Sequence, residues 1–327
     1  MKFALKTMLC VCFLVGASYA QKLGIVEDIK PGKCLSGFAT GTTCQHMEVV
    51  CPGLNDMGVT VGTVTGTGTV KGSITLFTGS TGEPPSPSSY IDSYKGMGFT
   101  TYNIAWDPPG WAYVGPEENL VSTSCEAATL LNYLHSVAPS GAFCGQGISG
   151  GSAELGYALA IYGEDTLLDN VELLSGPVMA NVEAGCITPA GPNITIVPTN
   201  GASFAEDPTY SAGYKTSLTE TTGYSCAPKK PTSTTANNAW AAQSIVQTTS
   251  ILNYPQTTIA GWVCNNGLNN SAAEGWEFYS ALQSEYTLTS ITGCTGPENV
   301  DTGTTPQGLN AETAIEQDMQ TQCIGRH

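Results

Sequence analysis

Basic residues are scarce in this chain: 327 residues include 11 lysines and arginines against 27 aspartates and glutamates, and the net charge is −16. Strong negative charge repels phosphate backbones and anionic headgroups, so we expect neither nucleic acid nor anionic lipid as a partner. A neutral or cationic substrate is easier to accommodate. Histidine is also scarce, with three in the whole chain, so chemistry that needs an imidazole has few sources.

Long apolar runs are absent as well. The chain begins MKFALKTMLCVCFLVGASYA, in which Lys2 and Lys6 precede a short apolar core and the segment ends on small residues. This pattern predicts a secretory signal peptide with cleavage after Ala20, because the apolar core is shorter than the ~20 residues that span a bilayer. The mature chain would be 21–327. It would lose two lysines and no acid, which changes the net charge from −16 to −18.

Metal-binding spacings are missing too: we find no CxxC pair and no cysteine–histidine cluster, so we expect no structural metal. Two of the twelve cysteines lie in the predicted signal peptide, and the remaining ten predict up to five disulfides in an oxidising compartment. They are Cys34, Cys44, Cys51, Cys125, Cys144, Cys186, Cys226, Cys264, Cys294 and Cys323. In a eukaryotic host, Asn193 and Asn269 would be exposed N-glycosylation acceptors.

The order of predicted elements indicates an α/β fold. β-Branched alternation over 47–77 predicts three consecutive strands, antiparallel at first. From residue 90 onward, helices and strands alternate, which predicts a mostly parallel, twisted sheet with helices on both faces. The helices are predicted at 90–98, 120–139, 150–163, 271–283 and 310–323, and the later strands at 99–106, 141–149, 169–177, 257–264 and 286–294. Residues 178–254 lose this periodicity and are predicted to be an insertion over the sheet of a single domain.

One motif carries chemistry. In GQGISGG, the residues Gly147 to Gly151 match G-x-S-x-G between a predicted strand and a predicted helix. A serine in such a turn has a strained backbone and needs small flanking residues, and the helix N-terminus favours a developing oxyanion. The alternative is a glycine-rich nucleotide-binding turn through Gly145, Gly147 and Gly150. It lacks the acidic residue on a following strand, so we expect no cofactor and disfavour an oxidoreductase.

With this motif, the chain from about residue 47 to 323 resembles the α/β-hydrolase superfamily, in a secreted, disulfide-bearing form similar to esterases and lipases. The resemblance implies Ser149 as nucleophile, with oxyanion donors from Gly150 and from Thr78, Gly79 or Ser80. It also implies that 178–254 is a cap or lid. Because strands seven and eight are neighbours in that sheet, it implies a Cys264–Cys294 bridge, and Cys186–Cys226 would close the cap. The other pairings stay open.

The chain departs from the family where the acid and the histidine are expected. The loop after the seventh strand offers only amides before Glu274, and the loop after the eighth has Glu298 and Asn299 but no histidine. Amides do not stabilise an imidazolium as a carboxylate does. The amides are Asn265, Asn266, Asn269 and Asn270.

Several residues remain as candidates for the base and the acid. His46 and His135 are interpreted as ordinary surface or packed residues, whereas His327 alone follows Ser149 and is the tentative base. Glu298 is the alternative base. A displaced acid could come from the cap, at Glu183 or Asp207.

Aromatic residues follow the fourth strand of the family pattern. Trp106, Trp111 and Tyr113 would form an aromatic wall of a substrate groove suited to sugars or apolar acyl groups. The alternative is that Trp106 belongs to the core.

Together these features predict a secreted, monomeric serine hydrolase that acts on carboxylic esters of extracellular material through an acyl-enzyme at Ser149. Its substrate would be a small-molecule or polymer ester or a glycan. The alternative is a catalytically inactive binding or surface protein on the same scaffold, because the expected histidine and acid are missing.

Overall fold

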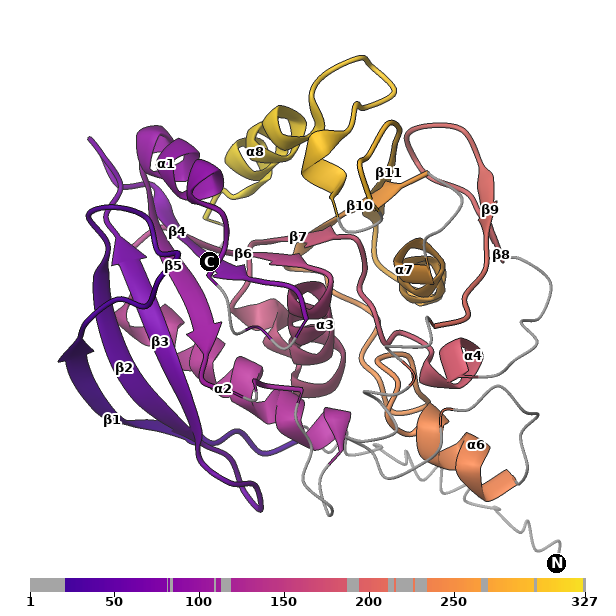
Figure 1. Ribbon diagram of the computed structural model, residues 1–327, viewed down its shortest axis with the longest axis horizontal. Helices are drawn as coiled ribbons and strands as arrows, with labels where there is room; N and C mark the ends of the chain where they lie inside the picture. Colours follow the sequence, from indigo (N-terminus) through magenta and orange to yellow (C-terminus); the bar gives the residue numbers. More distant parts are fainter. Residues whose placement is uncertain are drawn as a thin grey trace, which may run out of the picture.

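A nine-stranded sheet forms the centre of the molecule (Figure 1). The computed structural model describes residues 21–80, 82, 85–108, 110–112, 119–186, 194–210, 215, 226, 234–265, 270–296 and 299–325. The strands are β1 (Ile25–Gly32), β2 (Thr43–Val50), β3 (Met57–Val64), β4 (Gly72–Phe77), β5 (Phe99–Trp106), β6 (Ala142–Ile148), β7 (Asn170–Leu174), β10 (Thr258–Cys264) and β11 (Tyr286–Ile291). Their order is β1-β2-β3-β5-β4-β6-β7-β10-β11. Pairs up to β3–β5 are antiparallel and the others are parallel.

Helices cover both faces of this sheet, as the sequence predicts. Figure 1 shows α1 (Ser88–Met97) and α8 (Ala311–Gln322) on one face, and α2 (Leu120–Val137) and α3 (Gly150–Tyr157) on the other. The second face also carries α7 (Asn270–Ala281), whose Phe278 and Tyr279 belong to the same buried cluster as the α2 and α3 side chains. A π-helical turn, Ala158–Tyr162, extends α3. The mostly parallel sheet with two covered faces is therefore confirmed.

Two details of the sheet differ from the expectation. Strand β4 does not pair with β3 but inserts between β5 and β6, parallel to both. Strand β1, an edge strand before the predicted sheet, was not expected. Most of its side chains are exposed and it includes Asp28 at a positive φ of 53°, so it shows neither alternation nor an apolar face.

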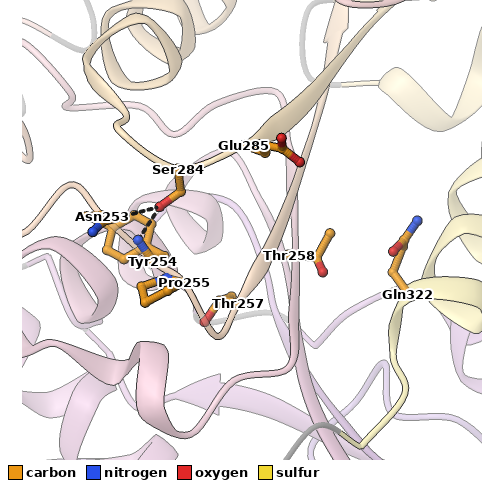
Figure 2. Close-up of a pocket in the computed structure, with 8 residues that line it drawn as sticks. All are labelled: Asn253, Tyr254, Pro255, Thr257, Thr258, Ser284, Glu285 and Gln322. Atoms are coloured by element: carbon orange, nitrogen blue, oxygen red, sulfur yellow. Dashed lines mark hydrogen bonds between the residues drawn. The ribbon is translucent and has the colours of Figure 1, made fainter.

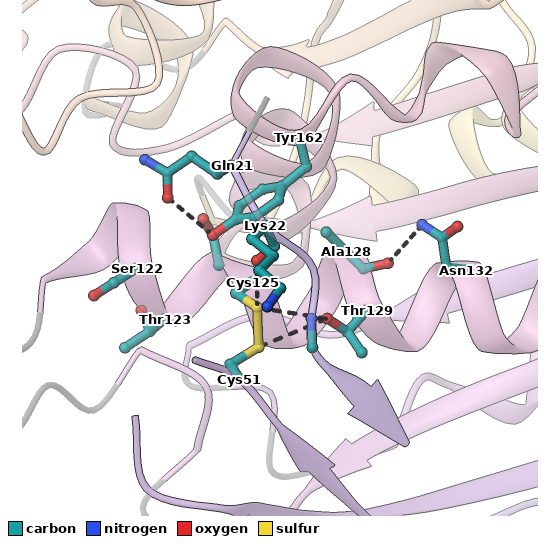
Figure 3. Close-up of a disulfide and its surroundings, with 12 residues drawn as sticks. Gln21, Lys22, Cys51, Ser122, Thr123, Cys125, Ala128, Thr129, Asn132 and Tyr162 are labelled. Carbon is teal, nitrogen blue, oxygen red and sulfur yellow. Dashed lines mark hydrogen bonds between the residues drawn. A yellow bond between two sulfur atoms is a disulfide. The ribbon is translucent and has the colours of Figure 1, made fainter. Parts of the chain in front are cut away.

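The chain before β1 is tied to helix α2 (Figure 3). The N–H of Gly24 donates to the hydroxyl of Thr129 (2.8 Å), and the hydroxyl of Tyr162 lies 3.4 Å from the side-chain oxygen of Gln21. The Cys51–Cys125 disulfide lies beside them and links the end of β2 to α2. Covalent and polar contacts thus fix the start of the described chain on the helix layer.

All ten cysteines outside the first 20 residues form disulfides. Cys264–Cys294 and Cys186–Cys226 are present, which confirms the two expected pairings. The register of β10 with β11 places the first pair at the ends of neighbouring strands. The others are Cys34–Cys44, Cys51–Cys125 and Cys144–Cys323. Such density of disulfides is typical of proteins from oxidising compartments.

The described part of the expected insertion contains four short elements: α4 (Val182–Cys186), β8 (Ile194–Ile196), β9 (Phe204–Glu206) and α6 (Thr234–Ala241). Strands β8 and β9 pair antiparallel beside α7, as Figure 1 shows. Within the described residues, no helix combines the length and apolarity needed to cross a membrane.

Candidate active site

Ser149 occupies a sharp turn between β6 and α3. Its backbone has φ 51° and ψ −113°, a conformation that side-chain-bearing residues rarely adopt and that persists only when the surroundings enforce it. The N–H of Ser149 donates to the carbonyl of Leu174 in β7 (2.8 Å), and its carbonyl accepts from Ser152 N (3.0 Å) and Ala153 N (3.1 Å). These bonds hold the turn from both sides. The residue remains partly exposed.

Close packing explains the small residues on either side of the turn. A Cβ built on Gly147 would lie 2.3 Å from the carbonyl oxygen of Gly151, and one built on Gly151 would lie 2.3 Å from the carbonyl oxygen of Phe77. Neither position has room for a side chain. The geometry at Ser149, Gly147 and Gly151 therefore has the form expected for a nucleophile elbow.

The loop after β4 passes directly over this turn. A Cβ built on Gly79 would lie 3.3 Å from Ser149 Cβ and 3.8 Å from Ser149 Oγ, and one built on Gly150 would lie 3.0 Å from Ser80 N. Among the described residues, no hydrogen bond uses the N–H of Gly79, Ser80 or Gly150. The backbones of Gly79 and Gly150, whose N–H groups have no partner among the described residues, therefore lie close to the serine turn, in the region where an oxyanion hole requires donors.

A buried carboxyl group supports that loop from below. Glu154 of α3 is fully buried, and its Oε2 accepts from the indole N–H of Trp106 (2.8 Å). Its Oε1 lies 3.2 Å from the position that a Cβ on Gly82 would take. The backbone N–H of Gly82 in turn donates to the Gly79 carbonyl (3.1 Å), and the Gly82 carbonyl accepts from the backbone N–H of Trp106 (2.9 Å). Burial raises the pKa of Glu154 well above its usual range, despite the indole hydrogen bond that lowers it.

Neither described histidine lies at Ser149. His46 Nδ1 is 2.8 Å from the hydroxyl of Thr60 and its Nε2 is 3.2 Å from the Lys33 carbonyl, so both ring nitrogens have partners on the antiparallel side of the sheet. His135 packs edge-on against Phe143, with ring centroids 5.1 Å apart. Phe143 lies at the start of β6, whereas Ser149 follows its end, about 20 Å away at 3.3 Å per residue. The interpretation of both as packed or surface residues is consistent with these contacts.

Glu274, the first carboxylate after the seventh strand of the family pattern, and the two displaced-acid candidates Asp207 and Glu183 have other roles or no described link to the turn. Glu274 is fully buried and its Oε2 accepts from the N–H of Asn181 (2.9 Å), so it joins α7 to the chain after β7. Burial raises its pKa to about 8. Asp207 accepts from the N–H of Thr209 (2.8 Å) in a local turn. Within the described residues, no hydrogen bond joins Asp207 or Glu183 to Ser149.

Both candidate bases, Glu298 and His327, lie outside the described residues. The described chain after β11 continues to Gly296, and the described chain after α8 ends at Gly325. A Cβ on Gly325 would be 3.4 Å from Ala142 N, at the start of β6, whereas Ser149 follows the end of that strand.

The expected aromatic wall is wrong for its two described members. Trp106 is 1% exposed and bonds to Glu154, and Trp111 is fully buried and packs edge-on against Tyr157. Both indoles are core side chains that α3 covers, and the loop after β4 lies against Trp106 as well. Tyr113 lies outside the described residues. So do both predicted N-glycosylation acceptors, Asn193 and Asn269, and the amide of Asn266 in the loop after β10.

Sequence could not have revealed the role of Glu154. A glutamate in a helix is normally solvated, and its only signal is that apolar and small residues surround it in SAELGYALA. Within the described part of the chain, no three histidine, cysteine or acidic side chains are grouped as a metal site would require.

The fold resembles those of esterases whose structures are known. No protein-family model matches the chain, and no curated protein matches it. Among solved structures, it is similar to acetyl xylan esterase 1 from Thermoanaerobacterium sp. JW/SL YS485, with a TM-score of 0.55 and 10% identity over 90% of this chain and 86% of that chain. It is also similar to a protein from Silicibacter sp. TM1040 provisionally assigned as a thioesterase, with a TM-score of 0.50 and 11% identity over 81% and 80%. With its strand order and the serine turn after β6, the chain therefore has the α/β-hydrolase fold.

Proposed function

We propose that this protein is a secreted serine hydrolase of carboxylic esters, with Ser149 as nucleophile. The observation that carries the proposal is the strained backbone of Ser149, at φ 51° and ψ −113°, beside amide groups that donate to no described residue. A protein retains such a conformation at a cost of ~1–3 kcal/mol, which is characteristic of functional sites. The similarity to esterases at 10–11% identity supports the fold, so the activity rests on this geometry.

In the proposed reaction, Ser149 Oγ attacks the ester carbonyl and its proton passes to a base. The N–H groups of Gly150 and of Gly79 or Ser80 stabilise the tetrahedral oxyanion. Collapse expels the alcohol and leaves an acyl-enzyme, which water hydrolyses to the free acid. Loss of one oxyanion donor typically lowers kcat by ~100- to 1,000-fold, so the loop after β4 is as important to this proposal as the serine.

Two residues are candidates for the base that accepts the Ser149 proton: His327, which alone of the histidines follows Ser149 in the sequence, and Glu298 as the alternative. A carboxylate is a weak base for a serine hydroxyl unless its surroundings raise its pKa, so we expect slow turnover if Glu298 serves.

The second candidate function is ligand binding without catalysis. It is favoured by one observation: both described histidines lie at other parts of the sheet, with His46 on β2 and His135 near the start of β6. Such a protein would retain the serine turn and its amide donors but would not form an acyl-enzyme.

A fluorophosphonate probe distinguishes the two. We expect the oxidised, folded protein to be labelled at Ser149, Ser149→Ala to lose the label, and Ser136→Ala, which removes an exposed hydroxyl on α2, to keep it. Absence of labelling in wild-type protein with five intact disulfides would refute the hydrolase and support the binding protein. Esterase assays of His327→Ala and Glu298→Gln then test the base: the variant that loses activity while the other retains it identifies the residue that accepts the proton.

A further inference from the structure

The carbonyl group of Ser149 is held more firmly than the start of a helix requires. Besides the backbone N–H groups of Ser152 (3.0 Å) and Ala153 (3.1 Å), it accepts a third hydrogen bond, from the hydroxyl of Ser152 at 2.5 Å. The Ser152 side chain is fully buried, so water does not compete for this hydroxyl. Most helix carbonyls accept one intrahelical bond, whereas three donors fix the direction in which this C=O group points.

The direction of this carbonyl also sets the direction of the next N–H group. The peptide bond between Ser149 and Gly150 is trans and planar, so its C=O and N–H groups point in opposite directions. The carbonyl points into the first turn of α3. The Gly150 N–H therefore points out of the start of that helix, and no described residue accepts from it. This N–H is the oxyanion donor of the proposed reaction, and a rotation of the peptide plane would turn it away from the oxyanion.

Close packing keeps the hydroxyl of Ser152 in place. A Cβ built on Gly176, in the chain after β7, would lie 2.0 Å from Ser152 Oγ and 3.1 Å from Ser152 Cβ. Gly176 therefore lies directly against this side chain, and a larger residue at 176 would take the space of the hydroxyl. The absence of a side chain at this position is thus explained by the hydroxyl that occupies it.

Helix α7 holds Gly176 from another side. The hydroxyl of Tyr279 donates to the Gly176 carbonyl (2.9 Å), and a Cβ built on Gly275 would lie 2.5 Å from the same oxygen. Gly176 and Tyr279 are both buried. These contacts form a continuous path from α7 through Gly176 and Ser152 to the carbonyl of Ser149.

We propose that Ser152 is a positioning residue: its hydroxyl clamps the Ser149 carbonyl and so holds the Gly150 N–H in the direction that stabilises the oxyanion. This role rests on the proposed function of Ser149 as the nucleophile. Because Ser152 is fully buried, it touches no substrate and acts only through the peptide that joins Ser149 to Gly150. A donor that is already oriented lowers the reaction barrier, since it does not have to turn as the charge develops.

The kinetics of Ser152→Ala with a fluorophosphonate probe test this role. Two backbone donors to the Ser149 carbonyl remain, so loss of one hydrogen bond should lower the maximal labelling rate about five- to tenfold. The half-saturating concentration of probe should stay unchanged, because the oxyanion forms only in the transition state. A role in stability alone would lower the folded fraction, which circular dichroism melting curves measure, and would leave both constants of the folded protein unchanged.

Two other serines provide matched controls. Ser124 on α2 is fully buried, and its hydroxyl also donates to the carbonyl three residues before it, that of Val121 (2.7 Å). Ser284 lies at the opposite edge of the sheet from the serine turn, where its hydroxyl bonds to Asn253 and Tyr254 beside a cavity of about 410 Å³ (Figure 2). Folded Ser124→Ala and Ser284→Ala should both be labelled with wild-type constants.

Hydrogen exchange separates this proposal from the proposed function, because it needs no activity. The N–H of Ser149 bonds to the Leu174 carbonyl, and the N–H groups at 152 and 153 bond to the Ser149 carbonyl. In Ser152→Ala these three amides should exchange about five- to tenfold faster, since the turn opens more easily without the clamp. Mass spectrometry of peptides that contain residues 147–153 measures this change, and Ser124→Ala should leave it at the wild-type value.

Each outcome decides the proposal. Labelling of folded Ser152→Ala with wild-type constants would overturn it and leave the proposed function intact. A loss of labelling rate in Ser124→Ala as large as that in Ser152→Ala would also overturn it, because any buried hydroxyl would then have the same effect. If the wild type is not labelled, the proposed function fails and exchange alone decides: equal exchange of the three amides in the wild type and Ser152→Ala overturns the clamp, and faster exchange in the variant supports it.

Discussion

The buried carboxyl of Glu274 predicts that this protein loses stability as the pH rises. The side chain is fully buried in α7, and burial raises its pKa from 4.5 to about 8, although the hydrogen bond from the Asn181 N–H lowers it in part. A group whose pKa is higher in the folded state than in the unfolded state favours folding in its protonated form. Its contribution is complete below pH 4.5 and is lost as the pH rises toward 8.

A rise in the pKa of Glu274 from 4.5 to about 8 contributes roughly 5 kcal/mol to the free energy of unfolding, at 1.36 kcal/mol per pKa unit. About 4 kcal/mol of this contribution is lost between pH 4.5 and pH 8. Glu274→Gln removes the ionisation but keeps an oxygen that accepts from Asn181. The variant should therefore have about the stability of the wild type at pH 4.5 and be more stable by up to about 4 kcal/mol at pH 8.

Urea unfolding at pH 4.5, 6, 7 and 8, followed by tryptophan fluorescence with the disulfides intact, measures this difference. Glu27→Gln, at an exposed position of β1, is the matched control and should follow the wild type. Burial also raises the pKa of Glu164 to about 8, so the stability of every variant still falls as the pH rises. The quantity to compare is therefore the difference in free energy of unfolding between each variant and the wild type at the same pH. If the free energies of unfolding of the wild type and Glu274→Gln change with pH in parallel, the pKa of Glu274 is not raised in the folded protein and the reasoning is refuted.

Three further changes test the site and its support. Gly151→Ala places a Cβ 2.3 Å from a β4 carbonyl oxygen, so we expect loss of fluorophosphonate labelling and a destabilisation of more than ~2 kcal/mol in urea. Glu154→Gln should keep labelling because its amide oxygen still accepts from the Trp106 indole, whereas Glu154→Leu should reduce it; equal labelling would refute the support role. The double variant Cys144→Ala, Cys323→Ala should lower the free energy of unfolding by up to about 5 kcal/mol, because that disulfide closes 179 residues, and an unchanged melting temperature would contradict this.

The sequence predicted those parts of the fold that depend on local pattern. Alternation and helical spacing identified the strands of the main sheet from β2 onward and the helices that cover it, but not the short elements α4, β8, β9 and α6, and the strand–turn–helix context located Ser149. The Cys264–Cys294 pairing followed from the expected adjacency of the last two strands, and the register of β10 with β11 confirms that adjacency.

Other features depend on long-range contacts that no local pattern encodes. Strand β1 is exposed on both faces, so nothing in its sequence marks it as a strand. Tryptophan after a strand suits a groove or a core equally well, and Trp106 is buried because Glu154, far away in sequence, accepts its N–H. The position of the C-terminal tail depends on the pairing of Cys323 with Cys144, which the sequence left open.

That pairing imposes an order on biosynthesis. Cys144 has no native partner while 179 further residues are made, at ~5–20 residues per second, or about 10–35 s. Four other cysteines, Cys186, Cys226, Cys264 and Cys294, emerge during this time and compete for it. A heterologous host will therefore need disulfide isomerase activity to produce uniform material.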